Sequence, residues 1–286
     1  ASCQGSFARA TRLWQLATRH TQRIMRLGIL GGGRAAWAFG SAWKRIGWPL
    51  SGVWLRDESQ SRIAELLETS RLDLADLAHE SELLLIAVSD RAIASVAAAI
   101  PDSEALVFHA SGALLSVRDG FSLHPLRSLS PVGTPSDLEG TLLVFEGQHK
   151  RTAKLIATAV GARFCEVAPE QKALYHAAAV FGANYVAAAL DISERLMQRA
   201  GVDNAREDLV ALALSAIENW RRHDGAQRFT GPASRRDAEV MQRHIAALAD
   251  EPQLAEIYEL LAAEIAGSLF ASSGDGVHNR RPLGAG

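Results

Sequence analysis

The chain has 286 residues, of which 48% are hydrophobic and 22% are charged. This is the composition of an ordinary globular protein, and it excludes a disordered or fibrous chain. Lysine and arginine total 30 and aspartate and glutamate total 32, so no overall basic charge points to nucleic acid. The aliphatic run at residues 83–88 is far shorter than the roughly 20 residues of a membrane span, so no membrane association is expected. Two cysteines, Cys3 and Cys165, offer no disulfide framework and indicate a cytoplasmic protein.

The two ends of the chain differ from its middle. Residues 1–24 contain several arginines and no acidic residue, as in a transit peptide. Met25 lies just before the first predicted strand. This position favours a native start at Met25, with an added or disordered leader before it. The last segment, residues 272–286, is rich in Gly, Ser and Arg without an apolar period and is predicted to be disordered.

From Arg26 onward, short apolar runs alternate with helical patterns. The strands are predicted at residues 27–30, 51–55, 83–88, 105–109, 120–123, 141–145 and 163–167, and the helices at 35–46, 61–67, 92–99 and 150–160. This alternation predicts a mostly parallel, doubly wound sheet covered on both faces. Residues 25–168 are therefore expected to form an α/β Rossmann domain.

After Pro169 the strand signals stop. Ala, Leu and Val recur at helical spacing through residues 171–200, 204–220, 232–248 and 253–270. Glycines and prolines separate these runs. Residues 177–190 are so rich in alanine that they are expected to be buried nearly all round, at a helix–helix or subunit interface. Residues 169–271 are therefore predicted to form an all-α domain.

The strongest local signal is the run Gly31-Gly32-Gly33-Arg34-Ala35-Ala36 between the first strand and the first helix. Gly31 permits a tight turn, Gly33 lets the backbone approach a pyrophosphate, and the small Ala36 allows close helix–strand packing. The start of the helix, with Arg34 and Ala35, offers free N–H groups to phosphates. This pattern predicts a dinucleotide site.

The end of the second strand indicates which dinucleotide binds. Arg56 closes that strand and Ser59 follows it closely, so a 2′-phosphate is favoured and the cofactor is predicted to be NADP(H). Asp57 keeps NAD(H) possible. Val88 at the end of the third strand with Ser89 after it, and His109 at the end of the fourth, complete the predicted cofactor site, because ligands bind outside the carboxyl ends of such strands.

Four polar clusters are candidates for the reaction site. Ser111 and Gly112 follow the fourth strand, and His124 ends the fifth. His176 and Asn184 lie eight residues apart on the first long helix, a spacing that places them on one face. Finally, Thr230 and Gly231 precede a helix start that carries Arg235. Each cluster taken singly could be structural. The histidine spacings do not fit a zinc site, so no metal is predicted, and Ser111 lacks the Gly-x-Ser-x-Gly pattern of hydrolases.

These pieces together resemble a bacterial family of Rossmann-like oxidoreductases whose C-terminal half is a domain of unknown function. That family is distantly similar to pyrroline-5-carboxylate reductase, ketopantoate reductase and the 6-phosphogluconate dehydrogenase superfamily. The resemblance runs from about residue 25 to residue 270. The family commonly has Gly where this chain has Arg236. The resemblance implies a homodimer joined through the helical domain. It also implies that His176 takes the place of the lysine that ketopantoate-type reductases use.

The leading hypothesis is reduction of a small carbonyl or imine substrate that bears a carboxylate, with NADP(H) as cofactor. His176 is the first choice as proton donor and His124 the second. The substrate is expected to be oriented by Ser111, the Gly112 N–H and Asn184, with its carboxylate held by Arg235 beside Thr230 and Gly231.

Two alternatives stay open. One is an NADP(H)-binding sensor or interaction protein without turnover. It is supported by the view that the first long helix carries no catalytic lysine and by the extra cation at Arg236. The other is ketopantoate reduction in particular.

Overall fold

The structure is a computed structural model that describes residues 24–57 and 62–271, except the side chains of Ala226 and residues 268–271. The predictions for residues 1–23, Ser59 and the tail lie outside the described residues. The chain divides into two compact units between Tyr185 and Val186. The change from strands to helices falls earlier, at Pro169, so the first unit includes the helix that follows the sheet.

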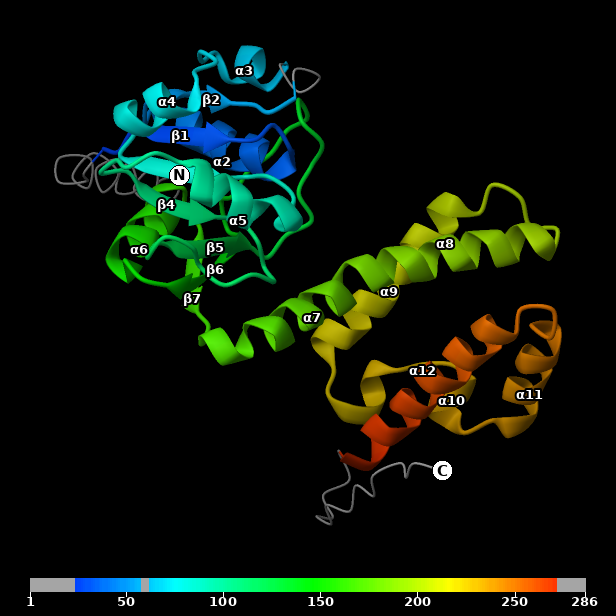
Figure 1. Cartoon of the computed structure of the whole chain (residues 1–286). Helices are drawn as coiled ribbons and strands as arrows, with labels where there is room; N and C mark the ends of the chain where they lie inside the picture. The colour runs from blue at the N-terminus through cyan, green and yellow to red at the C-terminus, as the bar shows by residue number, and fades with distance from the viewer. Residues whose placement is uncertain (1–23, 58–61, 272–286) are drawn as a thin grey trace, which may run out of the picture. The chain divides into compact units, whose positions relative to one another are not determined.

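The first unit is built on a seven-stranded sheet (Figure 1). In chain order its strands are β1 (Leu27–Leu30), β2 (Leu50–Trp54), β3 (Leu83–Ile86), β4 (Leu106–His109), β5 (Phe121–Pro125), β6 (Leu142–Gly147) and β7 (Arg163–Glu166). Their order in the sheet is β2-β1-β3-β4-β5-β6-β7. Only the β5–β6 pair is antiparallel, which confirms the predicted mostly parallel sheet.

Helices cover both faces of this sheet because its central strands are apolar on both sides. β1 and β3 are buried along their whole length, as expected for strands between two helical layers. One core cluster joins the sheet to α2 (Arg34–Arg45), α3 (Arg62–Leu67) and α6 (Lys150–Ala159). The other joins it to α4 (Leu74–Glu80) and α5 (Asp90–Ala99). The sequence pattern did not predict α4, which begins at the Asp73 cap.

The helices after the sheet are α7 (Lys172–Gly182), α8 (Asn184–Arg199), α9 (Arg206–Arg222), α10 (Pro232–Arg235), α11 (Ala238–Ala247) and α12 (Pro252–Ala271). Two of the predicted helical runs are each broken once. The run at 171–200 breaks at Ala183, whose φ of −130° and ψ of −68° are not helical. The run at 232–248 breaks at Arg236, which adopts a left-handed φ of 58°.

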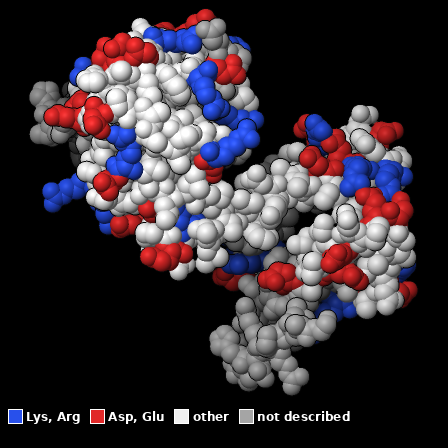
Figure 2. All heavy atoms as spheres, viewed as in Figure 1, with Lys and Arg blue, Asp and Glu red and all other residues white. Residues whose placement is uncertain are grey.

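Within the described part of the chain, residues 169–199 are the one helical stretch long and apolar enough to cross a membrane by length and composition. Phe181 and Tyr185 are more than half exposed there, and uncharged side chains dominate the visible surface of α7 and the start of α8 (Figure 2). Lys172 at the start of the stretch is nevertheless buried against the sheet, and the stretch is interrupted at Ala183. We therefore interpret it as two helices with an apolar face and not as a membrane span.

Candidate functional site

The glycine turn after β1 has the geometry that a dinucleotide site needs. Gly31 has a φ of +119°, and a Cβ there would lie 2.4 Å from the carbonyl oxygen of Ala87, so only glycine fits. A Cβ on Gly33 would meet nothing within 4 Å, which leaves its backbone open to a ligand. Gly33 caps α2 without a side-chain hydrogen bond, and the first turn of α2 has no acidic residue. The N–H groups at this helix start are therefore available to an anion.

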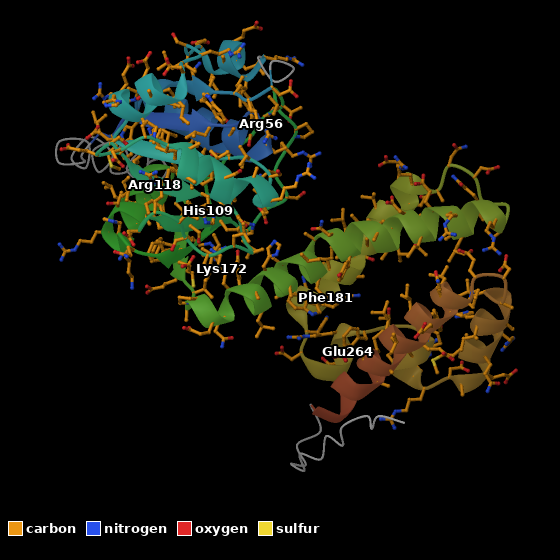
Figure 3. The ribbon with its side chains drawn as sticks, in the orientation of Figure 1. Arg56, His109, Arg118, Lys172, Phe181 and Glu264 are labelled. Atoms are coloured by element: carbon orange, nitrogen blue, oxygen red, sulfur yellow. The ribbon has the colours of Figure 1, made fainter. Side chains whose placement is uncertain are left out.

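The neighbouring strand ends place the other predicted cofactor residues at the same edge of the sheet. Arg56 follows β2 and is exposed (Figure 3). Val88 is half-buried and Ser89 is exposed after β3. Ser89 caps α5 without using its side chain, so its hydroxyl is available as well.

His109 and Ser111 shape the loop after β4. His109 is fully buried; its Nε2 lies 2.9 Å from the Leu115 carbonyl and its Nδ1 accepts from the Ser111 N–H. The Ser111 hydroxyl donates to Asp90 and accepts from the backbone N–H groups of two following residues. The polar atoms of both residues are thus used inside the protein. Their geometry supports an indirect role, in which they fix the backbone that carries Gly112.

That loop packs against two imidazole rings. The Nδ1 of His124 on β5 lies 2.5 Å from the Tyr175 hydroxyl on α7. The ring of His176 stands nearly perpendicular to that of His124, with centroids 5.8 Å apart. A Cβ on Gly112 would fall 2.5 Å from a carbon of His176 and 3.0 Å from two carbons of His124. The structure therefore brings together Gly112, His124 and His176.

Because α7 ends at Gly182 and α8 begins at Asn184, Asn184 and His176 lie on different helices. The prediction of one continuous helix carrying both residues is wrong. Asn184 is exposed.

Lys172 is the residue that the sequence analysis missed. Lys172 begins α7, and its side chain is only 2% exposed (Figure 3). Its ammonium donates to Ser122 and, at 3.1 Å, to Glu146. Glu146 also accepts from the backbone and hydroxyl of Ser116. The signal available in the sequence was a single lysine at the start of an apolar helix. That signal does not identify the partners of Lys172, because they are distant in the sequence.

Burial and charge set the protonation of this cluster. Burial, followed by the charges of His176 and Lys172, lowers the pKa of His124 to about 4. Burial raises the pKa of Tyr175 to about 12. Burial also lowers the pKa of Lys172. For Glu146, burial raises the pKa, but the hydrogen bond and charge of Lys172 outweigh it and hold this pKa below its ordinary value.

The remaining predicted residues belong to the second unit. Gly231, with a φ of +98°, caps the four-residue helix α10, which contains Arg235. Thr230 and Arg235 are exposed. Arg236 ends α10 in the left-handed region, a conformation that glycine adopts without strain.

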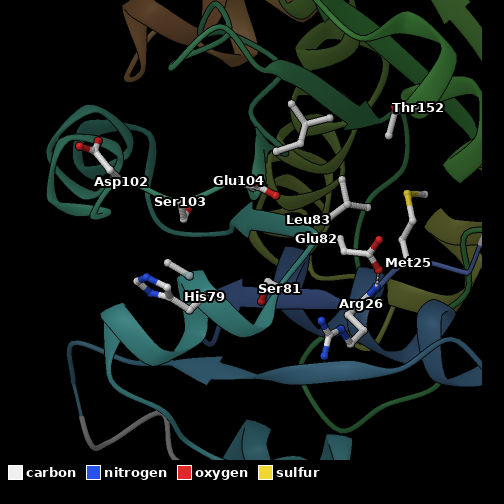
Figure 4. A pocket seen from close by; sticks show the side chains of 12 residues that line it. Met25, Arg26, His79, Ser81, Glu82, Leu83, Asp102, Ser103, Glu104 and Thr152 are labelled. Carbon is white, nitrogen blue, oxygen red and sulfur yellow. Dashed lines mark hydrogen bonds between the residues drawn. The ribbon is translucent and has the colours of Figure 1, made fainter.

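A hollow also lies at the opposite edge of the sheet, lined by Ser81, Glu82, Asp102 and Glu104 among others (Figure 4). It adjoins the amino ends of β3 and β4, whereas ligands of such sheets bind at the carboxyl ends. Among the described residues, no group of three or more His, Cys, Asp or Glu side chains is arranged to hold a metal ion.

Several solved structures share this fold. A proposed NADP oxidoreductase from Bacteroides fragilis is 24% identical, with 85% of this chain and 98% of that one aligned and a TM-score of 0.74. A reductive aminase from Aspergillus terreus, solved with a reduced NADP derivative, cyclohexanone and allyl amine, is 14% identical over 87% and 95% of the chains, with a TM-score of 0.61. The pyrroline-5-carboxylate reductase of Streptococcus pyogenes is 13% identical over 85% and 99%, with a TM-score of 0.57.

The family models divide the chain before the boundary between the two units, because the second model begins at residue 142, in β6. No curated protein matches the sequence significantly. Residues 15–119 match the Rossmann-like domain, and residues 142–265 match a domain of unknown function, DUF2520. The chain therefore combines a part that matches the Rossmann-like domain with a C-terminal part that matches DUF2520.

Proposed function

We propose that this protein is an NADP(H)-dependent oxidoreductase that reduces a small carbonyl or imine substrate bearing a carboxylate. The observation that carries the proposal is the Gly31 turn at the same sheet edge as the paired imidazoles of His124 and His176. The fold is shared with a reductive aminase and a pyrroline-5-carboxylate reductase, which supports the reaction class by analogy only.

The residues present fit a dinucleotide. The open N–H groups at the start of α2, with Arg34 beside them, would hold the pyrophosphate. Arg56 would pair with the 2′-phosphate of NADP(H), because a guanidinium binds phosphate with two parallel hydrogen bonds. Asp57 beside it leaves NAD(H) as the weaker alternative.

The bound nicotinamide would supply the hydride. His176 would donate the proton to the developing alkoxide or amine, because neither of its ring nitrogens makes a hydrogen bond within the part of the chain that the structure describes. Imidazole is also the side chain best suited to proton transfer near neutral pH. Asn184 would orient the substrate. In the second unit, Arg235 with Thr230 and Gly231 offers a guanidinium that can bind a carboxylate.

We also propose that the protein forms a homodimer through its helical part. Large apolar side chains on α9 and α12 are more than half exposed, among them Leu212, Leu214, Trp220, Leu260 and Leu261. Large apolar side chains that stay exposed are typical of a surface that another chain covers.

Nicotinamide fluorescence during titration tests the cofactor assignment. NADPH should bind, and Arg56→Ala should weaken NADPH binding at least tenfold, because a charge-assisted pair is lost, while NADH binding changes little. Arg151→Ala, an exposed residue of α6, serves as control. Failure of the wild-type protein to bind either dinucleotide would overturn the proposal.

Turnover tests the proton donor. Against a panel of 2-keto acids and cyclic imines, His176→Ala should lower kcat by about 10²–10⁴-fold. An unchanged rate would remove His176 from this role. Binding of NADPH without turnover of any panel member would favour the sensor function. Ketopantoate reduction is less well supported, because Lys172 of α7 is held by Glu146.

A further inference from the structure

One nitrogen of the His124 ring is fixed by the protein and the other is left open. Tyr175 lies 2.5 Å from Nδ1, and Gly112 packs on the ring carbons. Within residues 24–57 and 62–271, Nε2 of His124 makes no hydrogen bond. A half-buried imidazole with one occupied and one open nitrogen can present a single defined group to a ligand.

The nature of that group follows from the partner of Nδ1. A neutral imidazole has one N–H donor and one bare acceptor nitrogen. A phenol is a better donor than acceptor, and a bare imidazole nitrogen is a strong acceptor. The hydroxyl of Tyr175 therefore donates to Nδ1, which places the ring proton on Nε2.

The charged and titratable groups around the pair keep both partners neutral. From α7, Lys172 and His176 disfavour a positive charge on His124, and from α5 Asp90 opposes them more weakly. Burial, with Cys165 of β7 nearby, keeps the Tyr175 hydroxyl protonated. The arrangement is therefore stable through neutral pH.

We propose that Tyr175 is a positioning residue that holds His124 in the tautomer with its proton on Nε2, so that this N–H donates a hydrogen bond to the reducible group of the substrate. The inference rests on the proposed oxidoreductase function. The substrate atom must then carry a free electron pair, as a carbonyl oxygen or an unprotonated imine nitrogen does. As hydride reaches the carbon, the two electrons of the C=O or C=N π bond move to this atom, His176 protonates it, and NADPH is oxidised.

The tautomer is tested directly by long-range ¹H–¹⁵N NMR of the histidine rings, with His124→Asn to assign the signal. The wild-type protein should show a protonated Nε2 and a bare Nδ1 from pH 5.5 to 8. Tyr175→Phe should give a mixture of tautomers. Tyr258→Phe is the matched control, because it removes the same kind of bond, 2.8 Å long, to Nδ1 of His244. A proton on Nδ1 of His124 in the wild-type protein overturns the inference even if Tyr175→Phe fails to fold.

Kinetics test the role of the donor. Tyr175→Phe should lower kcat about tenfold, which corresponds to about 1.4 kcal/mol, and leave NADPH binding unchanged. A permanently charged N-methyl cyclic iminium should be reduced at least a hundredfold more slowly than the corresponding unmethylated imine. Equal rates would overturn the inference and leave the oxidoreductase standing. Absence of NADPH binding would instead overturn the proposed function, and the NMR result would still decide the tautomer.

Discussion

At the scale of single residues, the most constrained position of the site is Gly112, whose missing side chain makes room for two imidazoles. Gly112→Ala should lower kcat at least tenfold and destabilise the fold by about 1–3 kcal/mol, because the new methyl group overlaps both rings. Steady-state kinetics and thermal unfolding check this. Gly182→Ala is the control, because a Cβ there meets nothing within 4 Å. Equal changes in kcat and thermal stability for the two variants would contradict the close packing of Gly112 against the two imidazoles.

His124 makes stability depend on pH. Its folded-state pKa of about 4 lies below the ordinary value of 6.5, so the unfolded chain binds more protons between these values. The free energy of unfolding should therefore fall as the pH falls from 6.5 to 4, by up to about 3 kcal/mol. Burial lowers the pKa of His109 as well, which acts in the same direction.

Urea unfolding at a series of pH values measures this dependence. His124→Asn should have a flatter pH profile than the wild-type protein. Parallel profiles would show that His124 is not the titrating group.

Arg236 carries a backbone strain, because it lies in the left-handed region that favours glycine. Its φ of 58° costs an ordinary residue roughly 1 kcal/mol. Arg236→Gly should stabilise the protein by up to about that amount, less the added freedom of glycine in the unfolded chain. Arg236→Ala keeps the strain and should not stabilise. Thermal unfolding of the three proteins distinguishes the backbone effect from the loss of charge.

At the scale of elements, α7 is fixed on β5 by two side-chain pairs in register. The ammonium of Lys172 donates to the Ser122 hydroxyl. Tyr175 lies one helical turn after Lys172, and its hydroxyl contacts His124, which lies two residues after Ser122 on the strand. Residues i and i+2 share a face of a strand, and residues i and i+3 share a face of a helix. The buried lysine therefore sets the register in which the imidazoles meet.

Removing that lysine should be costly. Lys172→Met leaves Glu146 buried without its counter-ion and should lower the free energy of unfolding by about 3–5 kcal/mol, whereas Lys172→Met with Glu146→Leu should cost less. The control is Lys150→Met, which breaks an exposed ion pair with Glu166 and should cost less than about 1 kcal/mol. Urea denaturation compares them. Similar losses for Lys172→Met and Lys150→Met would contradict the anchoring role.

The sequence predicted the elements well because their signals are local. The first strand has the predicted bounds, residues 27–30, and Gly31 forms the expected turn. The Lys172 cluster could not be predicted, since its partners lie 50 and 26 residues away in the chain. The single helix expected through residue 183 was also wrong, because the break there depends on backbone angles that no proline signals.

At the scale of the whole molecule, the exposed apolar side chains of the helices predict self-association. Light scattering after gel filtration should give the mass of a dimer, and Leu212→Glu should shift it toward the monomer, because a charge would be buried in the interface. Ile24→Glu, an exposed apolar position in the first unit, should remain dimeric. A monomeric wild-type protein would contradict the proposal.

The burial of Lys172 also determines how the polypeptide can be dissected. A fragment that ends at Ala168, just after the last strand, would lack Lys172. The Glu146 carboxylate would then be buried without its counter-ion. An isolated Rossmann fragment should therefore be soluble and unfold cooperatively only when it extends beyond Gly182, so that it includes the first long helix as well as the sheet.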